Sequence, residues 1–492
     1  MKLEKLVPFF LLTSFILFQP SISTYAAESN SHESKKRSLI PPSAQDAFLR
    51  TARLLQQKQA AQSLEAQNTD TRRGGSSATQ QELTDQSPDL LASTALPSQD
   101  QTAIYNWFLQ NQQANSTGLV TSYPNDPRVA QVSCGPGCTY PVNLNTQAFS
   151  YDQALSGILM LNQGDTQNVQ RIFNFYYSQW QAEQTNFHGF WTTYNAQDPN
   201  GPKVEYMKIT GSNAWMGIFC LQYYTKTGDT RGRDLATKIG KWIVSLPHQN
   251  GGVAMGDSDI WANLYSVENN LSYYSLVNSL SSKAATSADR NLFKTERSNL
   301  KNWLKTQAYD PTTGLFKRGT GGDTIKAFDT NSWAVLVLGV QTLKNWGINV
   351  DNLVVQTERT FGVQTNGSFG GSTLTAKGFD FSDAANAATI GRTGMKWVEG
   401  TNQMISVYKT LAYWYRGNQT KAAYYNNRAN YFSSLNAQNS IPDNGSLSYY
   451  YADQSSVQIF SDNPYWSTAS GAAIASTAWV YFSAGGINPF NI

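Results

Sequence analysis

The feature that most constrains this chain is a short turn that occurs three times at regular spacing. A glycine followed by Asp or Asn lies at the centre of residues 163–166, 227–230 and 416–420. Glycine often ends a helix in the left-handed conformation, and Asp, Asn or Thr then caps the next helix, so each turn predicts a helical hairpin. Gly164 and Gly228 are 64 residues apart, and Gly228 and Gly417 are 189 apart, which is three times 63. The chain therefore repeats with a period near 63 residues.

Tryptophans follow a similar period. Five of them stand at or just before apolar runs, at a mean spacing close to 63 residues: Trp215, Trp261, Trp333, Trp397 and Trp466. Residues 101–492 have room for six such periods. A chain of 492 residues would make three domains at about 150 residues each. The period instead predicts one domain over 101–492.

Each period contains one apolar run and one amphipathic run. We expect the apolar helices over 146–162, 213–225, 268–280, 330–343, 399–415 and 467–484. We expect their amphipathic partners over 102–112, 167–181, 232–245, 288–305, 350–361 and 421–435. A helix that is apolar all round is buried, so the first set predicts an inner layer and the second an outer one.

The apolar character of the last expected helix decides how these hairpins are arranged. An open array of helix pairs has two end repeats that need polar caps. The segment 467–484 is among the most apolar, and a closed ring has no ends. We therefore predict an all-α (α/α)6 toroid, with an open superhelix of helix pairs as the alternative.

The first hundred residues differ from the rest. A basic start, an apolar run over 6–18 and small residues at 23–27 form the pattern of a secretory signal peptide. The apolar run is shorter than the roughly 20 residues that span a membrane. We assign 1–27 to a signal peptide and 28–100, which is rich in Ser, Gln, Thr and Glu, to a low-complexity leader with room for one helix. We expect a secreted or periplasmic protein with no membrane span.

The amino-acid composition limits the classes of molecule that the protein can bind. The 37 Lys and Arg against 34 Asp and Glu give a net charge of +3, which is too small and dispersed to indicate nucleic acid. Three His and three Cys are scattered, so neither a metal site nor a cofactor is indicated. Aromatic residues reach 13% of the chain, beside many amides and hydroxyls, which suits a neutral, hydroxyl-rich ligand. We expect a monomer that binds a glycan.

Acidic residues stand at four of the six expected inner-helix starts. They are Asp152, Glu268, Asp329 and Glu399. An acid at a helix start also complements the helix dipole, at about 0.3–1 kcal/mol. Aromatic and amide neighbours, rather than lysines, flank all four, which ion pairing explains poorly. In a closed ring these starts would meet at one end, called the mouth below, and paired carboxyl groups are what glycosidic cleavage requires.

Several aromatic and polar residues near these starts are candidates for sugar binding. Tryptophan faces stack on sugar rings, although a large ring at a helix corner is often core. The predicted substrate-binding residues are Trp191, Trp261, Trp333, Trp397, Trp466, Asn269 and Arg392. Arg392, with Lys396 nearby, would contact an anionic sugar.

The six hairpins, the acids that open alternate helices and the aromatic mouth resemble the six-hairpin (α/α)6 glycosidase-like superfamily over residues 100–492. The resemblance implies hydrolysis of a glycan, often with inversion, by an acid on one inner-helix start and a base on another. Carried to this chain, it favours Glu268 as general acid and Glu399 as general base, with Asp152 and Asp329 binding sugar hydroxyls. A polysaccharide lyase, a sugar epimerase and a glycan-binding protein without catalysis are the alternatives.

Three local features complete the predictions. Cys134 and Cys138 would close a small disulfide ring in an oxidising compartment, whereas Cys220 lies in an apolar run and should be a buried free thiol. Residues 257–259 contain two acids that are more often solvated than calcium ligands. Residues 367–377, rich in Gly, Ser and Thr, predict a loop over the mouth.

Overall fold

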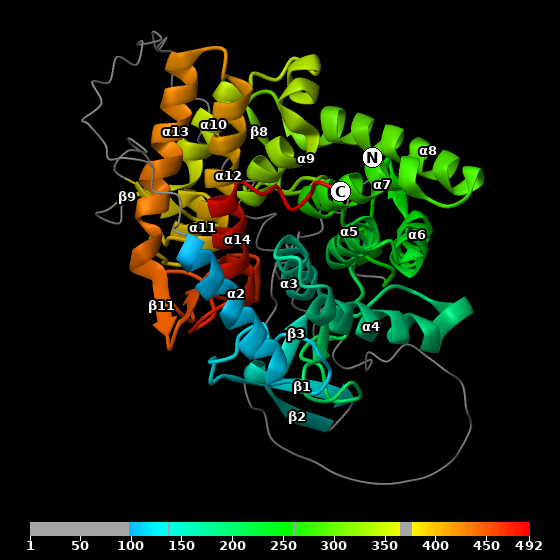
Figure 1. Ribbon diagram of the computed structural model, residues 1–492. Coiled ribbons are helices and arrows are strands. Elements are labelled where there is room, and N and C mark those ends of the chain that lie inside the picture. The colour runs from blue at the N-terminus through cyan, green and yellow to red at the C-terminus, as the bar shows by residue number, and fades with distance from the viewer. Residues whose placement is uncertain (1–97, 136–137, 259–260, 365–375) are drawn as a thin grey trace.

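The computed structural model describes residues 98–135, 138–258, 261–364 and 376–492, so the predicted signal peptide and nearly all of the leader lie outside it. Thirteen α-helices, α2 to α14, lie within these ranges. Figure 1 shows most of them in two concentric layers. None of the helices in the described part of the chain is long and apolar enough to cross a bilayer.

Six inner helices form a closed ring. Each packs against the next, and the last one packs against the first, which excludes the open superhelix. Nearly every residue of the first half of each helix is buried, as the apolar runs predicted. The inner helices are α3 (Ser150–Asn162), α5 (Thr210–Thr227), α7 (Val267–Lys283), α9 (Asp329–Asn345), α12 (Val398–Trp414) and α14 (Ile474–Gly485).

Six outer helices surround this ring, each packed on an inner neighbour. They bury only one face; in α13, for example, Tyr425, Arg428, Ala429 and Phe432 are buried. All six lie where the amphipathic runs predicted, and their ends differ by a few residues at most. The outer helices are α2 (Ser98–Gln113), α4 (Thr166–Glu183), α6 (Thr230–Val244), α8 (Ser287–Trp303), α10 (Val350–Phe361) and α13 (Gln419–Ser434).

The repeated turns join inner to outer helices, as predicted. Gly164 and Gly228 have left-handed φ angles of 76°, and Asp165 and Asp229 cap α4 and α6 by accepting from backbone N–H groups. Asn418 caps α13 in the same way. These short turns all lie at the end of the ring opposite the inner-helix starts.

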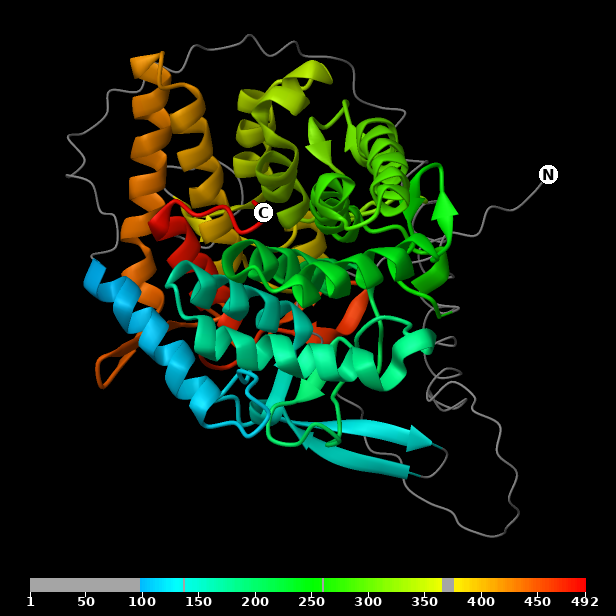
Figure 2. The same ribbon diagram turned by 45° about the vertical axis from the view of Figure 1, so that its right-hand side comes forward.

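Among the described residues, seven antiparallel strand pairs that the sequence did not predict lie around the mouth. They lie in the connections that lead into inner helices and add to the all-α prediction. The β1–β2 hairpin projects from the helical body (Figure 2). The pairs are β1 (Val129–Gly135) with β2 (Cys138–Asn143), β3 (Gln147–Phe149) with β4 (Thr193–Asn195), β5 (His248–Gln249) with β6 (Gly252–Val253), β7 (Tyr309–Asp310) with β8 (Leu315–Phe316), β9 (Gly362–Gln364) with β10 (Ala376–Phe379), β11 (Ser440–Asp443) with β12 (Ser446–Tyr449) and β13 (Gln458–Phe460) with β14 (Asn463–Ser467).

Two expected helix starts were wrong for this reason. The expected helix 146–162 begins only at Ser150, because Gln147–Phe149 forms β3. The expected helix 467–484 begins only at Ile474, because Ser467 ends β14 and residues 468–473 are not helical. A short helix, α11 (Ala384–Thr389), was not predicted either.

One polar side chain in the first turn of each inner helix fixes the preceding connection. Asn270 shows the pattern: its Oδ1 accepts from Val253 N at 2.8 Å and its Nδ2 donates to Val253 O at 2.9 Å. These bonds satisfy backbone groups that lie away from water and would otherwise be costly. The equivalent bonds are Gln153 to Val120, Asn213 to Phe190, Asn331 to Phe316, Thr401 to Phe379 and Thr477 to Tyr449.

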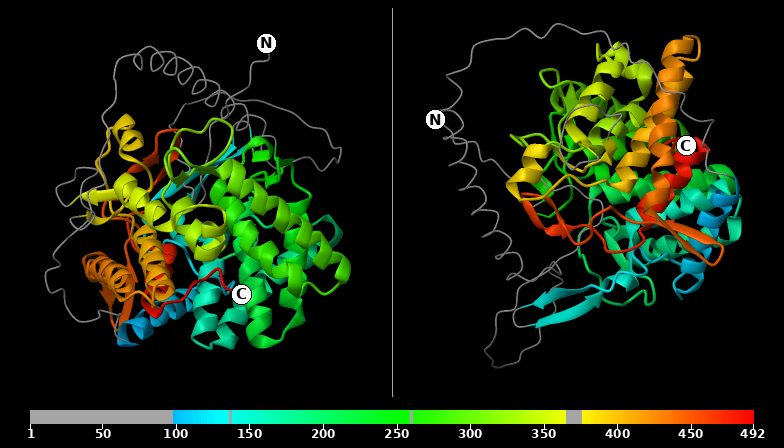
Figure 3. Two further views of the ribbon diagram at one scale, coloured as in Figure 1. Left: turned by 90° about the horizontal axis from the view of Figure 1, so that it is seen from above. Right: turned by 90° about the vertical axis from the view of Figure 1, so that its left-hand side faces the viewer.

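The C-terminal tail enters the ring from the end opposite the mouth. The right-hand view of Figure 3 shows the C-terminus and the β1–β2 hairpin on opposite sides of the molecule. The ring of Phe490 lies 4.5 Å from that of Trp215 and 5.2 Å from that of Trp333. Asn488 donates to Leu336 O at 2.8 Å, near the break that Gly339 makes in α9 with φ 75° and ψ 154°. The tail therefore closes this end of the core.

Candidate active site at the barrel mouth

The four predicted acids all lie in the first turn of inner helices. Asp152 belongs to α3, Glu268 to α7, Asp329 to α9 and Glu399 to α12, so all four lie at the mouth end of the ring. Their exposed fractions are 0, 1, 3 and 0%. Carboxyl groups are rarely buried so completely unless they are paired or protonated.

Three of these acids interact electrostatically. Burial raises the pKa of Glu399 well above its usual range, and the negative charges of Asp152 and Asp329 raise it further. Burial also raises the pKa of Asp152 to about 7 and raises that of Asp329. Within the described residues, none of the three forms an ion pair with Lys, Arg or His. Three inner helices thus bring together carboxyl groups that hold protons near neutral pH.

Glu399 is held by two hydrogen-bond donors on the same oxygen. The Tyr151 hydroxyl donates to Oε1 at 2.7 Å, and Gln403 Nε2 donates to it at 3.2 Å. Ser332 in turn donates to Gln403 Oε1 at 2.9 Å. The other oxygen, Oε2, has no hydrogen-bond partner among the described residues.

The remaining acids have different surroundings. Neither oxygen of Asp152 makes a hydrogen bond of normal geometry with the described residues, although the nearby Ser122 hydroxyl offsets part of the rise in its pKa. Asp329 accepts from its neighbouring Thr330 N at 2.8 Å. Asn269 Nδ2 donates to Glu268 Oε2 at 3.5 Å. Asp152 is therefore the acid with the fewest contacts in the cluster.

The tryptophans predicted to bind substrate are mostly packed in the core. Trp261, Trp333, Trp397 and Trp466 are 5, 0, 1 and 1% exposed. Trp397, for example, stacks on Phe381 at 4.1 Å between ring centroids. Trp191 is the exception: it is half-buried, and Lys208 Nζ lies 4.7 Å from its ring centroid.

The two other predicted binding residues have protein partners. Arg392 is 7% exposed, and its guanidinium donates to Asp380 at 2.5 Å and to Ser382 at 3.0 Å. Lys396 donates to Leu435 O at 2.8 Å. Asn269 Oδ1 accepts from Gly211 N, which ties α7 to the start of α5. In the structure these side chains fix the framework around the mouth.

Other predicted features lie away from the mouth or outside the described residues. Cys220 is a buried free thiol, as predicted. The side chains of Cys134 and Cys138, residue 259 and residues 367–375 of the predicted loop are not described. No group of three potential metal ligands occurs among the described residues.

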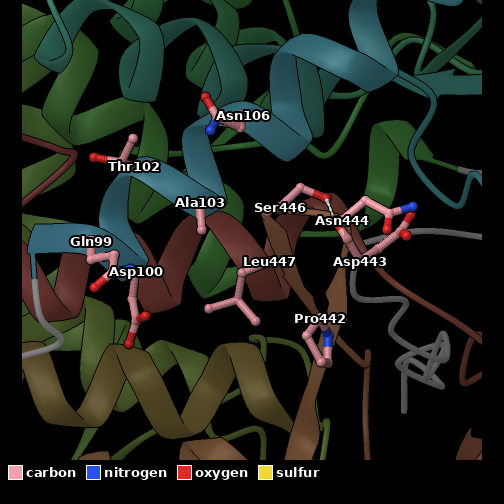
Figure 4. Close-up of a pocket in the computed structure, with 11 residues that line it drawn as sticks. Gln99, Asp100, Thr102, Ala103, Asn106, Pro442, Asp443, Asn444, Ser446 and Leu447 are labelled. Carbon is pink, nitrogen blue, oxygen red and sulfur yellow. Dashed lines mark hydrogen bonds between the residues drawn. The ribbon is translucent and has the colours of Figure 1, made fainter.

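A surface hollow of about 570 Å³ lies apart from the acids, between the N-terminal half of α2 and the β11–β12 hairpin (Figure 4). Asp100 and Asn106 line one side of it, and Asp443, Asn444 and Leu447 line the other. None of the four predicted acids contributes to its lining.

Sequence reasoning missed three residues of the site: Tyr151, Gln403 and Trp479. Tyr151 precedes Asp152 in the sequence, and Gln403 lies one helical turn after Glu399, so both share a helix with a predicted acid. Trp479 comes from α14, where no acid marks the helix start. Its indole Nε1 donates to the Tyr151 hydroxyl at 2.9 Å.

Comparisons with known proteins agree with this architecture. No family model matches the chain, and no curated protein matches its sequence. Solved structures do match. A D-mannose isomerase matches with TM-score 0.55 and 10% identity, over 81% of this chain and 99% of the isomerase chain. A glycosidase variant matches with TM-score 0.52 and 11% identity, over 80% of this chain and 100% of that one.

A sugar epimerase from a ruminal bacterium matches with TM-score 0.52 and 12% identity, over 79% of this chain and 98% of that one. At such identities the likeness concerns the fold alone. The chain has the six-hairpin (α/α)6 fold of these carbohydrate-active enzymes.

Proposed function

We propose that this protein is an exported glycoside hydrolase that cleaves an oligo- or polysaccharide with carboxyl groups at the barrel mouth. The observation that carries the proposal is the interaction of Asp152, Asp329 and Glu399, which stand on three inner helices without ion-pair partners in the described chain. Hydrolysis of a glycosidic bond needs one carboxyl group that is protonated and one that is ionised.

The electrostatics favour a particular division of roles. Burial and the charges of two neighbouring acids hold the pKa of Glu399 well above its usual range, so it keeps its proton as the pH rises through neutrality. Asp152, with a pKa of about 7, ionises earlier. We therefore assign Glu399 as general acid and Asp152 as general base, which differs from the first assignment of Glu268 as acid and Glu399 as base. Asp329 and Glu268 then bind the sugar.

In the proposed reaction Glu399 donates one proton and Asp152 accepts one. Glu399 gives its proton to the glycosidic oxygen while the bond from that oxygen to the anomeric carbon breaks. Asp152 takes a proton from a water molecule, whose oxygen attacks the anomeric carbon from the other face. These two steps invert the anomeric configuration. Proton NMR of the anomer that forms first would test the inversion.

Substrate access needs movement at the mouth. Because the carboxyl groups are at most 3% exposed, a sugar reaches them only if the side chains above them shift. Binding of the correct glycan would supply the free energy for that change. This is consistent with carboxyl groups kept away from water until the substrate arrives.

Histidine placement argues against epimerisation. The two described histidines lie outside the inner ring: His248, in β5, bonds to Glu296 of α8 at 3.1 Å, and His188 lies in the connection after α4. Neither imidazole stands on an inner helix, and that of His248 already pairs with Glu296. The epimerase and isomerase structures that match the chain therefore support its fold and not their activity.

The test is a panel of neutral and acidic polysaccharides with the purified protein. We expect reducing-sugar release from at least one glycan and a loss of about a thousandfold or more in Glu399→Gln. The exposed Asp443→Asn, which makes the same acid-to-amide exchange, is the control and should keep full activity. Circular dichroism should show that all variants are folded.

Three outcomes would contradict the proposal. Full turnover in a folded Glu268→Gln, Glu399→Gln double variant would exclude a role for either residue. Products that absorb in the ultraviolet as unsaturated uronic acids would show a lyase instead. A glycan that binds without any cleavage would indicate a binding protein.

A further inference from the structure

Two consecutive hydrogen bonds reach Glu399 of α12 from the next two helices of the ring, α14 and α3. Trp479 of α14 donates to the hydroxyl of Tyr151 of α3 at 2.9 Å, and that hydroxyl contacts Glu399 Oε1 of α12 at 2.7 Å. All three residues are buried, with exposed fractions of 0, 5 and 0% for Trp479, Tyr151 and Glu399. These polar groups join the three helices in their N-terminal halves.

The chemistry of the donors fixes the direction of both bonds. An indole N–H only donates, so the Tyr151 oxygen must accept from Trp479. The hydroxyl hydrogen of Tyr151 then points to Glu399 Oε1. Gln403 Nε2 also donates to this oxygen. Two donors therefore face Oε1, and a carboxyl proton placed on Oε1 would collide with them.

We propose that Tyr151 and Trp479 are positioning residues that, with Gln403, keep Oε1 of Glu399 as the accepting oxygen and place its proton on Oε2. This inference rests on the proposed role of Glu399 as general acid. Oε2 has no partner among the described residues, so it is the oxygen able to donate to a substrate. The hydrogen bonds to Oε1 thus determine which oxygen carries the proton. Residues that support a catalytic group commonly fix its geometry in this way.

The surrounding rings hold the two positioning residues in place. The Tyr151 ring lies 5.2 Å from that of Trp215, and Trp479 lies 6.4 Å from Phe490 of the C-terminal tail. Trp215 and Phe490 also contact each other and Trp333. With their rings fixed on several sides, neither Tyr151 nor Trp479 can change rotamer without disturbing the core.

The charges that face Glu399 set the sign of the expected effect. Asp152 of α3 and Asp329 of α9 raise its pKa, whereas the bonds from Tyr151 and Gln403 lower it. Removing the Tyr151 hydroxyl takes away a donor that stabilises the ionised form. The pKa of Glu399 should therefore rise further in Tyr151→Phe.

The test compares Tyr151→Phe with Tyr273→Phe. Tyr273 of α7 is also fully buried, but its hydroxyl has no hydrogen-bond partner in the described chain, so the same substitution removes no bond there. We expect kcat on the cleaved glycan to fall about ten- to a hundredfold in Tyr151→Phe, with KM changed by less than about threefold. The alkaline limb of its pH–rate profile should move to higher pH. Trp479→Phe should shift the limb in the same direction.

A second measurement does not depend on activity. The infrared carboxylic C=O band that disappears in Glu399→Gln reports the protonation of Glu399 directly. In Tyr151→Phe this band should change frequency and persist to higher pH than in the wild type, with Tyr273→Phe unchanged. An unaltered band and pH profile, or an equal effect in Tyr273→Phe, would overturn the inference. If no glycan is cleaved by the wild type, the proposed function fails, while the infrared titration still decides the hydrogen-bond assignment.

Discussion

At the scale of single residues, burying the carboxyl group of Asp152 lowers the free energy of unfolding above about pH 4. An aspartate in an unfolded chain ionises near pH 3.9. Burial raises the pKa of Asp152 to about 7 in the folded protein. Between these values the folded protein holds a proton that the unfolded chain has lost. The contribution of Asp152 to the unfolding free energy therefore falls as the pH rises from about 4 to 7, by up to about 1.4 kcal/mol per pH unit.

Asp152→Asn should remove this dependence. We expect the variant to match the wild type near pH 4 and to be more stable by a few kcal/mol, about 2–4, at pH 8. Urea unfolding at several pH values measures the difference, and Asp443→Asn controls for the lost charge. A stability difference between Asp152→Asn and wild type that does not change with pH would contradict the assignment. The gain in stability should accompany a loss of activity, as is common when a strained site is removed.

Residues at the mouth could be picked out from the sequence only where their residue type is scarce in the chain. Acids make an informative pattern because charged residues are just 14% of the chain, so Glu399 and Asp152 stood out. Tyr151 and Trp479 did not, because 26 Tyr and 13 Trp occur and most of them pack in the core. Tyr151 and Trp479 meet where α14 packs on α3 to close the ring, although they lie 328 positions apart in the sequence.

At the scale of elements, the first-turn amides explain how short connections acquire a defined structure. Asn270 bonds both backbone groups of Val253, which is 0% exposed. Asn270→Ala leaves these groups unsatisfied in the core, at about 1–3 kcal/mol each. We expect a loss of about 2–5 kcal/mol in unfolding free energy by chemical denaturation.

The control for that prediction is Asn291→Ala on the outer helix α8. Asn291 is exposed, and alanine is a better helix former there, so its stability should change by less than about 0.5 kcal/mol. Equal effects of the two substitutions would show that the amide of Asn270 contributes nothing special.

Helices could be predicted closely and strand pairs could not. Caps such as Asp165 and Asp229, together with apolar periodicity over a dozen or more residues, define helix ends. Strands such as His248–Gln249 contain two residues, too few to show alternation. They form because an amide such as Asn270 fixes the connection from a distance.

At the scale of the whole molecule, closure of the ring and the C-terminal tail make one core. The tail carries Phe490, 4% exposed, into contact with Trp215, Trp333 and Trp479, which come from three inner helices. Phe490→Ala should cost about 3–5 kcal/mol. The exposed Asn491→Ala is the control, and thermal unfolding followed by Trp fluorescence measures both. A Phe490→Ala variant as stable as Asn491→Ala would show that the tail does not complete the core.

The sequence repeat predicted the architecture because a period of two helices has few closed arrangements. It did not predict how the ring centre is filled: Trp333, Trp397 and Trp466, three of the predicted substrate-binding residues, are buried at 0–1% exposure. Periodicity locates large rings at helix starts without showing which way they face.

We propose that carboxyl groups at this mouth hydrolyse a glycosidic bond. Whether oxygen from water enters the product is the most direct test of this proposal. The wild type and Glu399→Gln are incubated with a cleaved glycan in water enriched in oxygen-18, and the products are analysed at once by mass spectrometry. The account predicts one heavy oxygen at the new reducing end for each bond cleaved by the wild type, and background labelling alone with Glu399→Gln. Cleavage without incorporation of the label, or equal incorporation by the variant, would contradict it.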